Sequence, residues 1–126
     1  MTRMIKSGAE NIFPAEVENC LEAHPAVKEA AVIGVPSERF LQDVKAVVVL
    51  NGTVPLTLPA SLSTVAAELI EHCRRNIASY KKPKTVEFLD ALPRTPDRAK
   101  DYAELDSKFG GGYPGDDNLG GGRSVR

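Results

Sequence analysis

The sequence predicts a small α+β domain, in which helices cover one face of a mostly three-stranded sheet. Apolar residues recur at every third or fourth position in two segments, as they do in amphipathic helices. Three other segments are expected to form strands, because two are apolar runs with many β-branched residues and the third alternates between polar and apolar residues. The segments follow one another in the order helix, strand, strand, helix, strand. This order is typical of helices packed against a small sheet.

Two helices are expected from the spacing of the apolar residues. The first begins at Pro14, since proline is well tolerated in the first turn of a helix, and ends before Pro25. The second runs from Leu62 to Tyr80, where apolar residues step by three or four and charged residues lie between them. One or two further helical turns are expected at residues 102–105.

Three strands are expected at residues 27–35, 44–50 and 85–89. The first two are nearly continuous apolar runs, which indicates that at least one face of each strand is covered. A short N-terminal β-hairpin is expected at residues 4–12. Residues 51–60 contain one glycine and two prolines and are expected to form a loop.

We expect one domain over residues 1–109 and a disordered tail over residues 110–126. The tail has two runs of three glycines and no hydrophobic pattern. The formal net charge of −1 gives no general attraction to nucleic acid or to anionic lipid. No apolar stretch approaches the roughly 20 residues that span a bilayer. We therefore expect a cytoplasmic protein that binds neither nucleic acid nor membrane.

The cysteines and histidines do not predict a metal site. Cys20 and Cys73 lie at apolar helix positions without Cys-x-x-Cys spacing, which favours reduced, buried thiols. His24 and His72 have no serine, cysteine or carboxylate at a spacing typical of a catalytic triad, and we assign neither a catalytic role.

A basic cluster near the middle of the chain has two interpretations. Lys81, Lys82 and Lys84 follow the second predicted helix, and positive charge is favoured at the C-terminus of a helix. The alternative is a phosphate-binding patch, in which the ring of Tyr80 or Phe40 offers a flat surface to an adenine. These residues alone do not decide between the two.

Five ordered blocks of the sequence resemble the C-terminal domain of adenylate-forming acyl-CoA synthetases, the AMP-binding enzymes, and most closely the bacterial fatty-acid and aryl CoA ligases. The blocks lie at residues 7–18, 24–36, 45–49, 80–84 and 86–96. One block is compatible with chance, whereas five in the same order are not. Together they extend the resemblance over about residues 4–102.

The resemblance implies a mobile lid on a larger N-terminal domain that binds ATP and a carboxylic acid. Such a lid alternates between a pose for acyl-adenylate formation, with ATP and Mg²⁺ as substrates, and a pose for thioester formation with CoA. This chain lacks the Ser/Thr/Gly-rich phosphate loop of the N-terminal domain. The resemblance therefore implies an inactive fragment of an acid–thiol ligase, whose partner is that domain, in the same longer chain or in trans.

The resemblance also assigns site residues. Five residues match the hairpin that faces the active site in the thioester pose, namely Ser7, Gly8, Ala9, Glu10 and Asn11. Three match positions near the nucleotide end of CoA, namely Phe40, Lys82 and Lys84. Arg3 best matches the hinge. No residue is assigned as a metal ligand.

The main departure from the family lies at the catalytic lysine. Where the family reads Asp-Gly-Lys, this chain reads Asp97-Arg98-Ala99, so no catalytic residue is assigned. Lys100 lies one residue late, and adjacent residues of an extended loop point to opposite sides. Lys100 is a possible substitute only after a local rearrangement. This departure keeps two alternatives open: a stand-alone, non-catalytic module that binds CoA or a partner, and a degenerate remnant.

Overall fold

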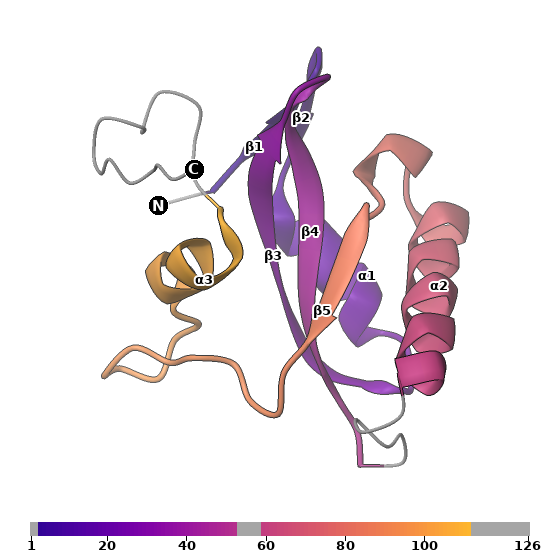
Figure 1. The fold of residues 1–126 in the computed structure, drawn as a ribbon, viewed down its shortest axis with the longest axis vertical. Helices are drawn as coiled ribbons and strands as arrows, with labels where there is room; N and C mark the ends of the chain where they lie inside the picture. The colour runs from indigo at the N-terminus through magenta and orange to yellow at the C-terminus, as the bar shows by residue number, and fades with distance from the viewer. Residues whose placement is uncertain (1–2, 53–58, 112–126) are drawn as a thin grey trace.

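One sheet of five strands lies at the centre of the part of the chain that the structure describes (Figure 1). The structure is a computed structural model and describes residues 3–52 and 59–111, except the side chains of residues 59–61. Its elements are β1 (Ile5–Ser7), β2 (Glu10–Ile12), α1 (Pro14–Glu22), β3 (Val27–Ser37), β4 (Leu41–Leu50), α2 (Pro59–Asn76), the 3-10 turn η1 (Ser79–Lys81), β5 (Thr85–Phe88) and α3 (Tyr102–Phe109). The predicted α+β class and N-terminal hairpin are confirmed.

The central strand β4 joins the N-terminal hairpin to the rest of the sheet. β3 pairs antiparallel along one edge of β4, from Val27 opposite Leu50 to Ser37 opposite Leu41. The other edge of β4 pairs antiparallel with β1, where Ser7 lies opposite Leu41, and parallel with β5. The β1–β2 hairpin and the segment that leads into β5 therefore reach the same edge of the sheet.

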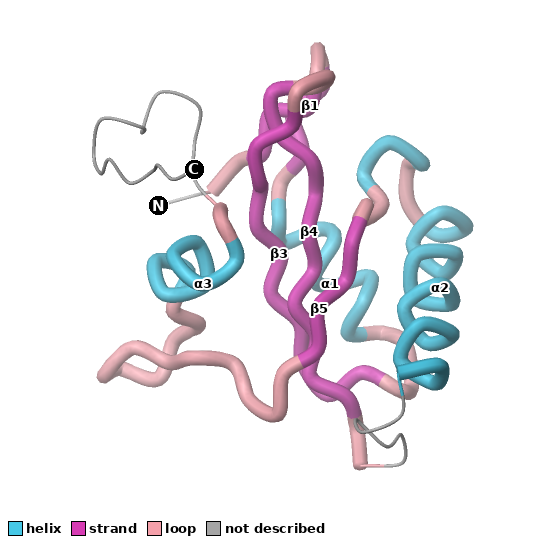
Figure 2. The backbone as a smooth tube through the Cα atoms, viewed as in Figure 1, coloured by secondary structure: helices cyan, strands magenta, loops and turns pink. Residues whose placement is uncertain are grey.

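Helices cover both faces of the sheet, whereas the sequence predicts helices on one face only. In Figures 1 and 2, α1 and α2 lie on one side of the sheet and α3 lies on the other. Ala30 and Val32 of β3 are buried in the cluster beneath α1 and α2, and Ala31 and Ile33 are buried in the cluster beneath α3. Because successive residues of this strand are apolar, both faces need a cover.

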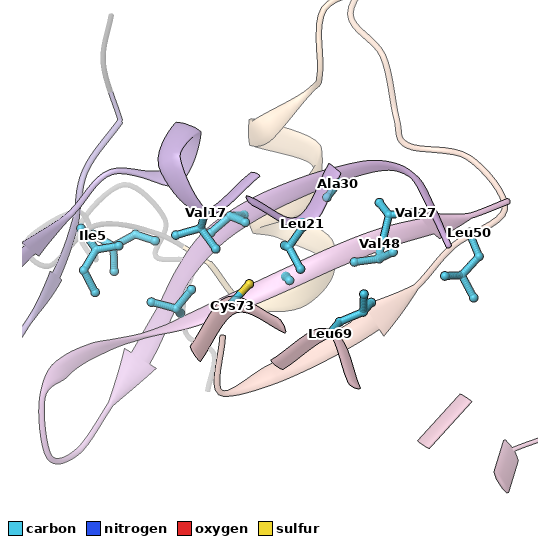
Figure 3. Packing of buried hydrophobic residues seen from close by; sticks show 13 residues of the cluster. Ile5, Val17, Leu21, Val27, Ala30, Val48, Leu50, Leu69 and Cys73 are labelled. Carbon is cyan, nitrogen blue, oxygen red and sulfur yellow. The ribbon is translucent and has the colours of Figure 1, made fainter. Parts of the chain in front are cut away.

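The larger cluster lies between the sheet and the two helices α1 and α2. Figure 3 shows Val17 and Leu21 of α1, with Leu69 of α2, directed toward strand residues such as Val48. All four of these side chains are fully buried. Their burial fixes α1 against the sheet, and α1 carries several of the polar contacts described below.

Among the helices and strands, α2 differs most from its predicted bounds. The helix begins at Pro59, inside the predicted loop, because proline is compatible with a first helical turn. It ends at Asn76 rather than Tyr80, because the extended backbone of Ala78 interrupts it before η1. Residues 53–58 of the predicted loop and 112–126 of the predicted tail lie outside the described residues.

We predict that Leu21→Ala lowers the free energy of unfolding by about 2–5 kcal/mol, because it removes a fully buried side chain and leaves a cavity. Urea unfolding followed by circular dichroism measures this change. The exposed Glu38→Ala serves as the control, with an expected change within about 0.5 kcal/mol. Equal effects of the two substitutions would contradict the packing described for α1.

Candidate functional site

The sequence-selected residues gather in two regions. We call the first region the hairpin surface, which comprises residues 7–11 with Phe40 and Lys84. We call the second region the 94–100 loop, which includes Ala99 and Lys100.

The turn of the β1–β2 hairpin is fixed to the β3–β4 turn. The backbone N–H of Gly8 donates to the carbonyl of Phe40 at 2.6 Å. Gly8 has a φ of +60°, which disfavours any side chain, and a Cβ there would lie 3.5 Å from the Phe40 ring. Ala9, Glu10 and Asn11 follow it and are exposed. The hairpin surface is thus anchored on one side and open on the other.

A buried amide holds the base of the same hairpin. The side chain of Gln42 is only 2% exposed, and its Oε1 accepts a hydrogen bond from the backbone N–H of Lys6 at 2.9 Å. A buried polar group of this kind is favourable only when it is hydrogen-bonded. Gln42 therefore fixes the hairpin relative to β4.

Two cations lie near the Phe40 ring. The Arg39 guanidinium carbon is 5.2 Å from the centre of the Phe40 ring, and the Lys84 ammonium is 5.5 Å from it. The backbone N–H of Lys84 donates to the carbonyl of Val44 at 2.8 Å, which holds this residue beside β4, while its side chain is exposed. The fold thus brings Gly8, Phe40 and Lys84 together from three separate segments.

The other two lysines of the basic cluster have local partners. Lys81 forms an ion pair with Glu16 at 2.7 Å, and this hydrogen bond raises the pKa of the Lys81 ammonium. Lys82 directly follows η1, and its Nζ donates to the carbonyl of Ser79, the first residue of that turn, at 3.2 Å. Of the two lysines that the resemblance assigns to CoA, Lys84 contacts Phe40, whereas the described contacts of the Lys82 ammonium are with Ser79.

The 94–100 loop is a tight hairpin closed by its own hydrogen bonds. The N–H of Thr95 donates to the carbonyl of Ala99 at 2.9 Å, and the N–H of Ala99 donates to the Thr95 hydroxyl at 3.2 Å. The Thr95 hydroxyl also donates to Asp97, which lowers the pKa of that carboxyl. Arg98 has a left-handed φ of 73°, at the position where the resemblance expects glycine. Ala99 is exposed at this tip.

The Lys100 side chain turns from the loop toward the body of the domain. Its Nζ donates to the carbonyl of Ala30 at 2.6 Å and to Glu22 at 3.1 Å, and it lies 3.5 Å from Glu18. The side chain is 19% exposed. For this ammonium to act beside Ala99, these contacts with α1 and β3 must first break.

Glu18 is the residue that sequence reasoning missed. The Glu18 side chain is 9% exposed, and its carboxylate accepts hydrogen bonds from the N–H of Val32 and from the Tyr102 hydroxyl. Burial, followed by this hydrogen bond, raises the pKa of Tyr102 above its ordinary value. The signal in the sequence is the position of Glu18 on the apolar side of α1, next to Val17 and three residues before Leu21.

Arg3 connects the N-terminal end of the described chain to the same network. Its guanidinium carbon lies 4.6 Å from the centre of the Tyr102 ring, and it forms an ion pair with Asp106 of α3 at 3.1 Å. The residue matched to the family hinge is therefore held against α3.

The two histidines have structural partners. His24 Nδ1 accepts from the N–H of Ala26 at 3.0 Å, and its Nε2 lies 2.9 Å from Glu68. His72 Nε2 lies 2.8 Å from the carbonyl of Cys20. Within residues 3–52 and 59–111, no three histidine, cysteine, aspartate or glutamate side chains group as metal ligands. No helix within these ranges combines the length and apolar character needed to cross a membrane.

Comparison with known sequences identifies a family and several related CoA ligases. The family described as "AMP-binding enzyme C-terminal domain" matches residues 16–98. The chain is 44% identical over 98 residues to a 3-oxocholest-4-en-26-oate–CoA ligase of Rhodococcus rhodochrous, covering 78% of this chain and 16% of that protein. It is 45% identical over 108 residues to a feruloyl-CoA synthase of Amycolatopsis, and this match covers 85% of this chain and 20% of that protein.

Solved structures of acyl-CoA synthetases also match this chain. An acyl-CoA synthetase of Brucella canis matches with a TM-score of 0.74 and 34% identity, covering 82% of this chain and 18% of that one. A fatty acyl CoA synthetase of Mycobacterium tuberculosis matches with a TM-score of 0.72 and 34% identity, and this match covers 85% of this chain and 20% of that one. The chain thus spans about a fifth of the length of these relatives or less.

We predict that Lys100→Met lowers the free energy of unfolding by about 1–3 kcal/mol, because it leaves the buried Glu18 carboxylate without its cation. Urea unfolding at neutral pH measures the change. Lys108→Met, which removes an exposed lysine of α3, is the matched control and should change stability by less than about 0.5 kcal/mol. A Lys100 variant as stable as the control would show that the ion pairs contribute nothing.

Proposed function

Because this chain belongs to the family of AMP-binding enzyme C-terminal domains, we propose that it acts as the mobile lid of an acyl-CoA synthetase. Such an enzyme activates a carboxylic acid with ATP and Mg²⁺ and then transfers the acyl group to CoA. The partner of the lid is the ATP-binding N-terminal domain, in the same longer chain or in trans. The match to about a fifth of each relative supports a lid rather than a complete ligase.

The hairpin surface carries the thioester-forming half of this proposal. The turn at Gly8 brings backbone without a side chain to the surface, which suits close approach of the pantetheine arm. The Phe40 ring offers a stacking surface to the adenine of CoA, and Lys82 and Lys84 offer positive charge to its phosphates. The convergence of Gly8, Phe40 and Lys84 is the observation that supports this role most directly.

The 94–100 loop is less suited to adenylate formation. A cation near the reacting carboxylate and phosphates stabilises the charge that develops in that step. Where the family has its lysine, this chain has the exposed methyl group of Ala99. The Lys100 ammonium donates hydrogen bonds to Glu22 of α1 and to the carbonyl of Ala30 in β3. We therefore propose a lid that supports thioester formation better than adenylate formation.

A complementation experiment tests the proposal. The chain is mixed with the N-terminal portion of a related CoA ligase, and the two half-reactions are followed separately. Thioester formation from supplied acyl-adenylate and CoA, with little adenylate synthesis from ATP, is the expected result. Ala99 also favours a second candidate, a non-catalytic module that binds CoA or a partner. Saturable CoA binding by a folded chain that supports neither half-reaction would replace the first candidate with this second one.

We predict that Ala99→Lys increases the rate of adenylate formation in that mixture by about 10²–10³-fold, because it restores a cation at the reacting groups. The rate of thioester formation from supplied adenylate should stay unchanged. Release of pyrophosphate from ATP measures the first step. Ala103→Lys adds the same charge at an exposed position of α3 and is the control. Equal acceleration by both variants would show a general charge effect and contradict the assignment.

We predict that Lys84→Ala raises the KM for CoA by about fivefold to tenfold in the thioester half-reaction, because one phosphate contact is lost. The exposed Lys108→Ala should leave this KM unchanged. Initial rates at varied CoA and fixed acyl-adenylate give both values. An unaltered KM in the Lys84 variant would remove Lys84 from the CoA site.

A further inference from the structure

Two arginines of the 94–100 loop line one cavity. Arg94 and Arg98 are the described residues around a surface cavity of about 490 Å³, and both are exposed. Figure 1 shows the segment between β5 and α3, which carries this loop, at the opposite end of the sheet from the β1–β2 hairpin. The cavity therefore lies apart from the hairpin surface.

Hydrogen bonds of the loop hold the two arginines beside each other. The N–H of Arg98 donates to the carbonyl of Thr95 at 2.8 Å. The Nη1 group of Arg94 donates to the carbonyl of Arg98 at 3.3 Å. The Nη2 group of Arg94 pairs with Glu29 of β3. Arg94 is thus joined both to the sheet and to the backbone of the second arginine.

Arg98 is a strained residue whose side chain has no polar partner within residues 3–52 and 59–111. Its φ of 73° is unfavourable for a residue that has a side chain. Residues held in such a conformation concentrate at functional sites, where the surrounding structure maintains the strain. The loop therefore keeps an exposed guanidinium in a fixed place without a counter-charge from the described residues.

The nearby carboxylates leave positive charge at the cavity. Glu29 pairs with Arg94, and this pair together with the contact to the Arg98 carbonyl uses two of the five N–H donors of the Arg94 guanidinium. The Asp97 carboxylate accepts a hydrogen bond from the Thr95 hydroxyl of the same loop. Donors of Arg94 and the whole guanidinium of Arg98 remain available to an anion.

We propose that Arg94 and Arg98 form a binding site for a diphosphate or triphosphate group, either inorganic or carried by a nucleotide. Guanidinium groups bind phosphate oxygens through paired N–H donors. A single carboxylate needs only one guanidinium, whereas a phosphate chain carries oxygens on more than one phosphorus and can engage two. The volume of the cavity is in the range of small-molecule sites. This inference does not depend on the proposed function, because the chain itself supplies both arginines.

A titration of the full chain with sodium pyrophosphate tests the proposal. Nitrogen-15 NMR at low salt follows the backbone amides and the Nε–Hε groups of the arginines. We expect saturable shifts at residues 94–100 with a dissociation constant in the millimolar range, and no comparable shifts with acetate at the same ionic strength. Shifts confined to the basic cluster at residues 80–84 would overturn the proposal. So would the absence of saturation up to about 20 mM pyrophosphate.

Variants separate a site from general attraction. Arg98→Gln should weaken pyrophosphate binding at least about fivefold, because one guanidinium is lost. Arg75→Gln removes an exposed arginine of α2 and should leave the affinity unchanged. Arg98→Gly also removes the guanidinium but suits the left-handed φ, so it should lose binding without a lower unfolding temperature. Equal affinities in the Arg98 and Arg75 variants would contradict the assignment.

A comparison of tripolyphosphate with ATP, both without Mg²⁺, distinguishes the two sources of the phosphate chain. Equal affinities, with shifts at Arg94 and Arg98, would show that the site binds the phosphate chain alone. Tighter binding of ATP with shifts at the same arginines would show that the nucleoside adds contacts. Binding of both compounds without any shift in the 94–100 loop would overturn the proposal.

Discussion

The buried carboxylate of Glu18 is the constraint on which the arrangement of the domain depends. It lies on α1, accepts a hydrogen bond from the backbone of β3 at Val32, and accepts another from Tyr102 at the start of α3. Lys100, at the end of the 94–100 loop, supplies the nearby positive charge. A buried carboxylate is costly unless it is hydrogen-bonded and paired. Glu18 has both the hydrogen bonds and the cation that its burial requires. Because these partners come from β3, α3 and the 94–100 loop, Glu18 fixes those segments and α1 relative to one another.

This network gives the two candidate regions different properties. The hairpin surface is held by backbone and amide hydrogen bonds on its inner side, and its outer residues Ala9, Glu10 and Asn11 are exposed. The 94–100 loop instead directs its lysine inward, to α1 and β3, and presents Ala99 at its tip. The first region leaves these outer residues exposed, as the proposed contact with CoA requires, whereas the second has Ala99 where the family has its lysine. The asymmetry between the proposed half-reactions follows from this difference.

The sequence predicts the parts of this structure that depend on local patterns. Pro14 and the apolar spacing predict α1, and the continuous apolar runs predict β3 and β4. The short segment at residues 102–105 cannot reveal that α3 lies on the second face, because that depends on packing against Ala31 and Ile33. The family resemblance selects Gly8, Phe40 and Lys84. The partners of Lys100 lie about 70 residues or more away, beyond any local pattern.

The central claim is that the Lys100 ammonium stays bound to α1 and β3 in solution, and it can be measured directly. Nitrogen-15 NMR of labelled lysine side chains measures how fast each ammonium exchanges protons with water. We expect a Lys100 signal with slow exchange, separate from those of exposed lysines such as Lys108, and a change in that signal in Glu22→Gln. A Lys100 ammonium that exchanges as fast as that of Lys108 would show a free side chain. It would contradict the claim that the 94–100 loop commits its lysine to α1.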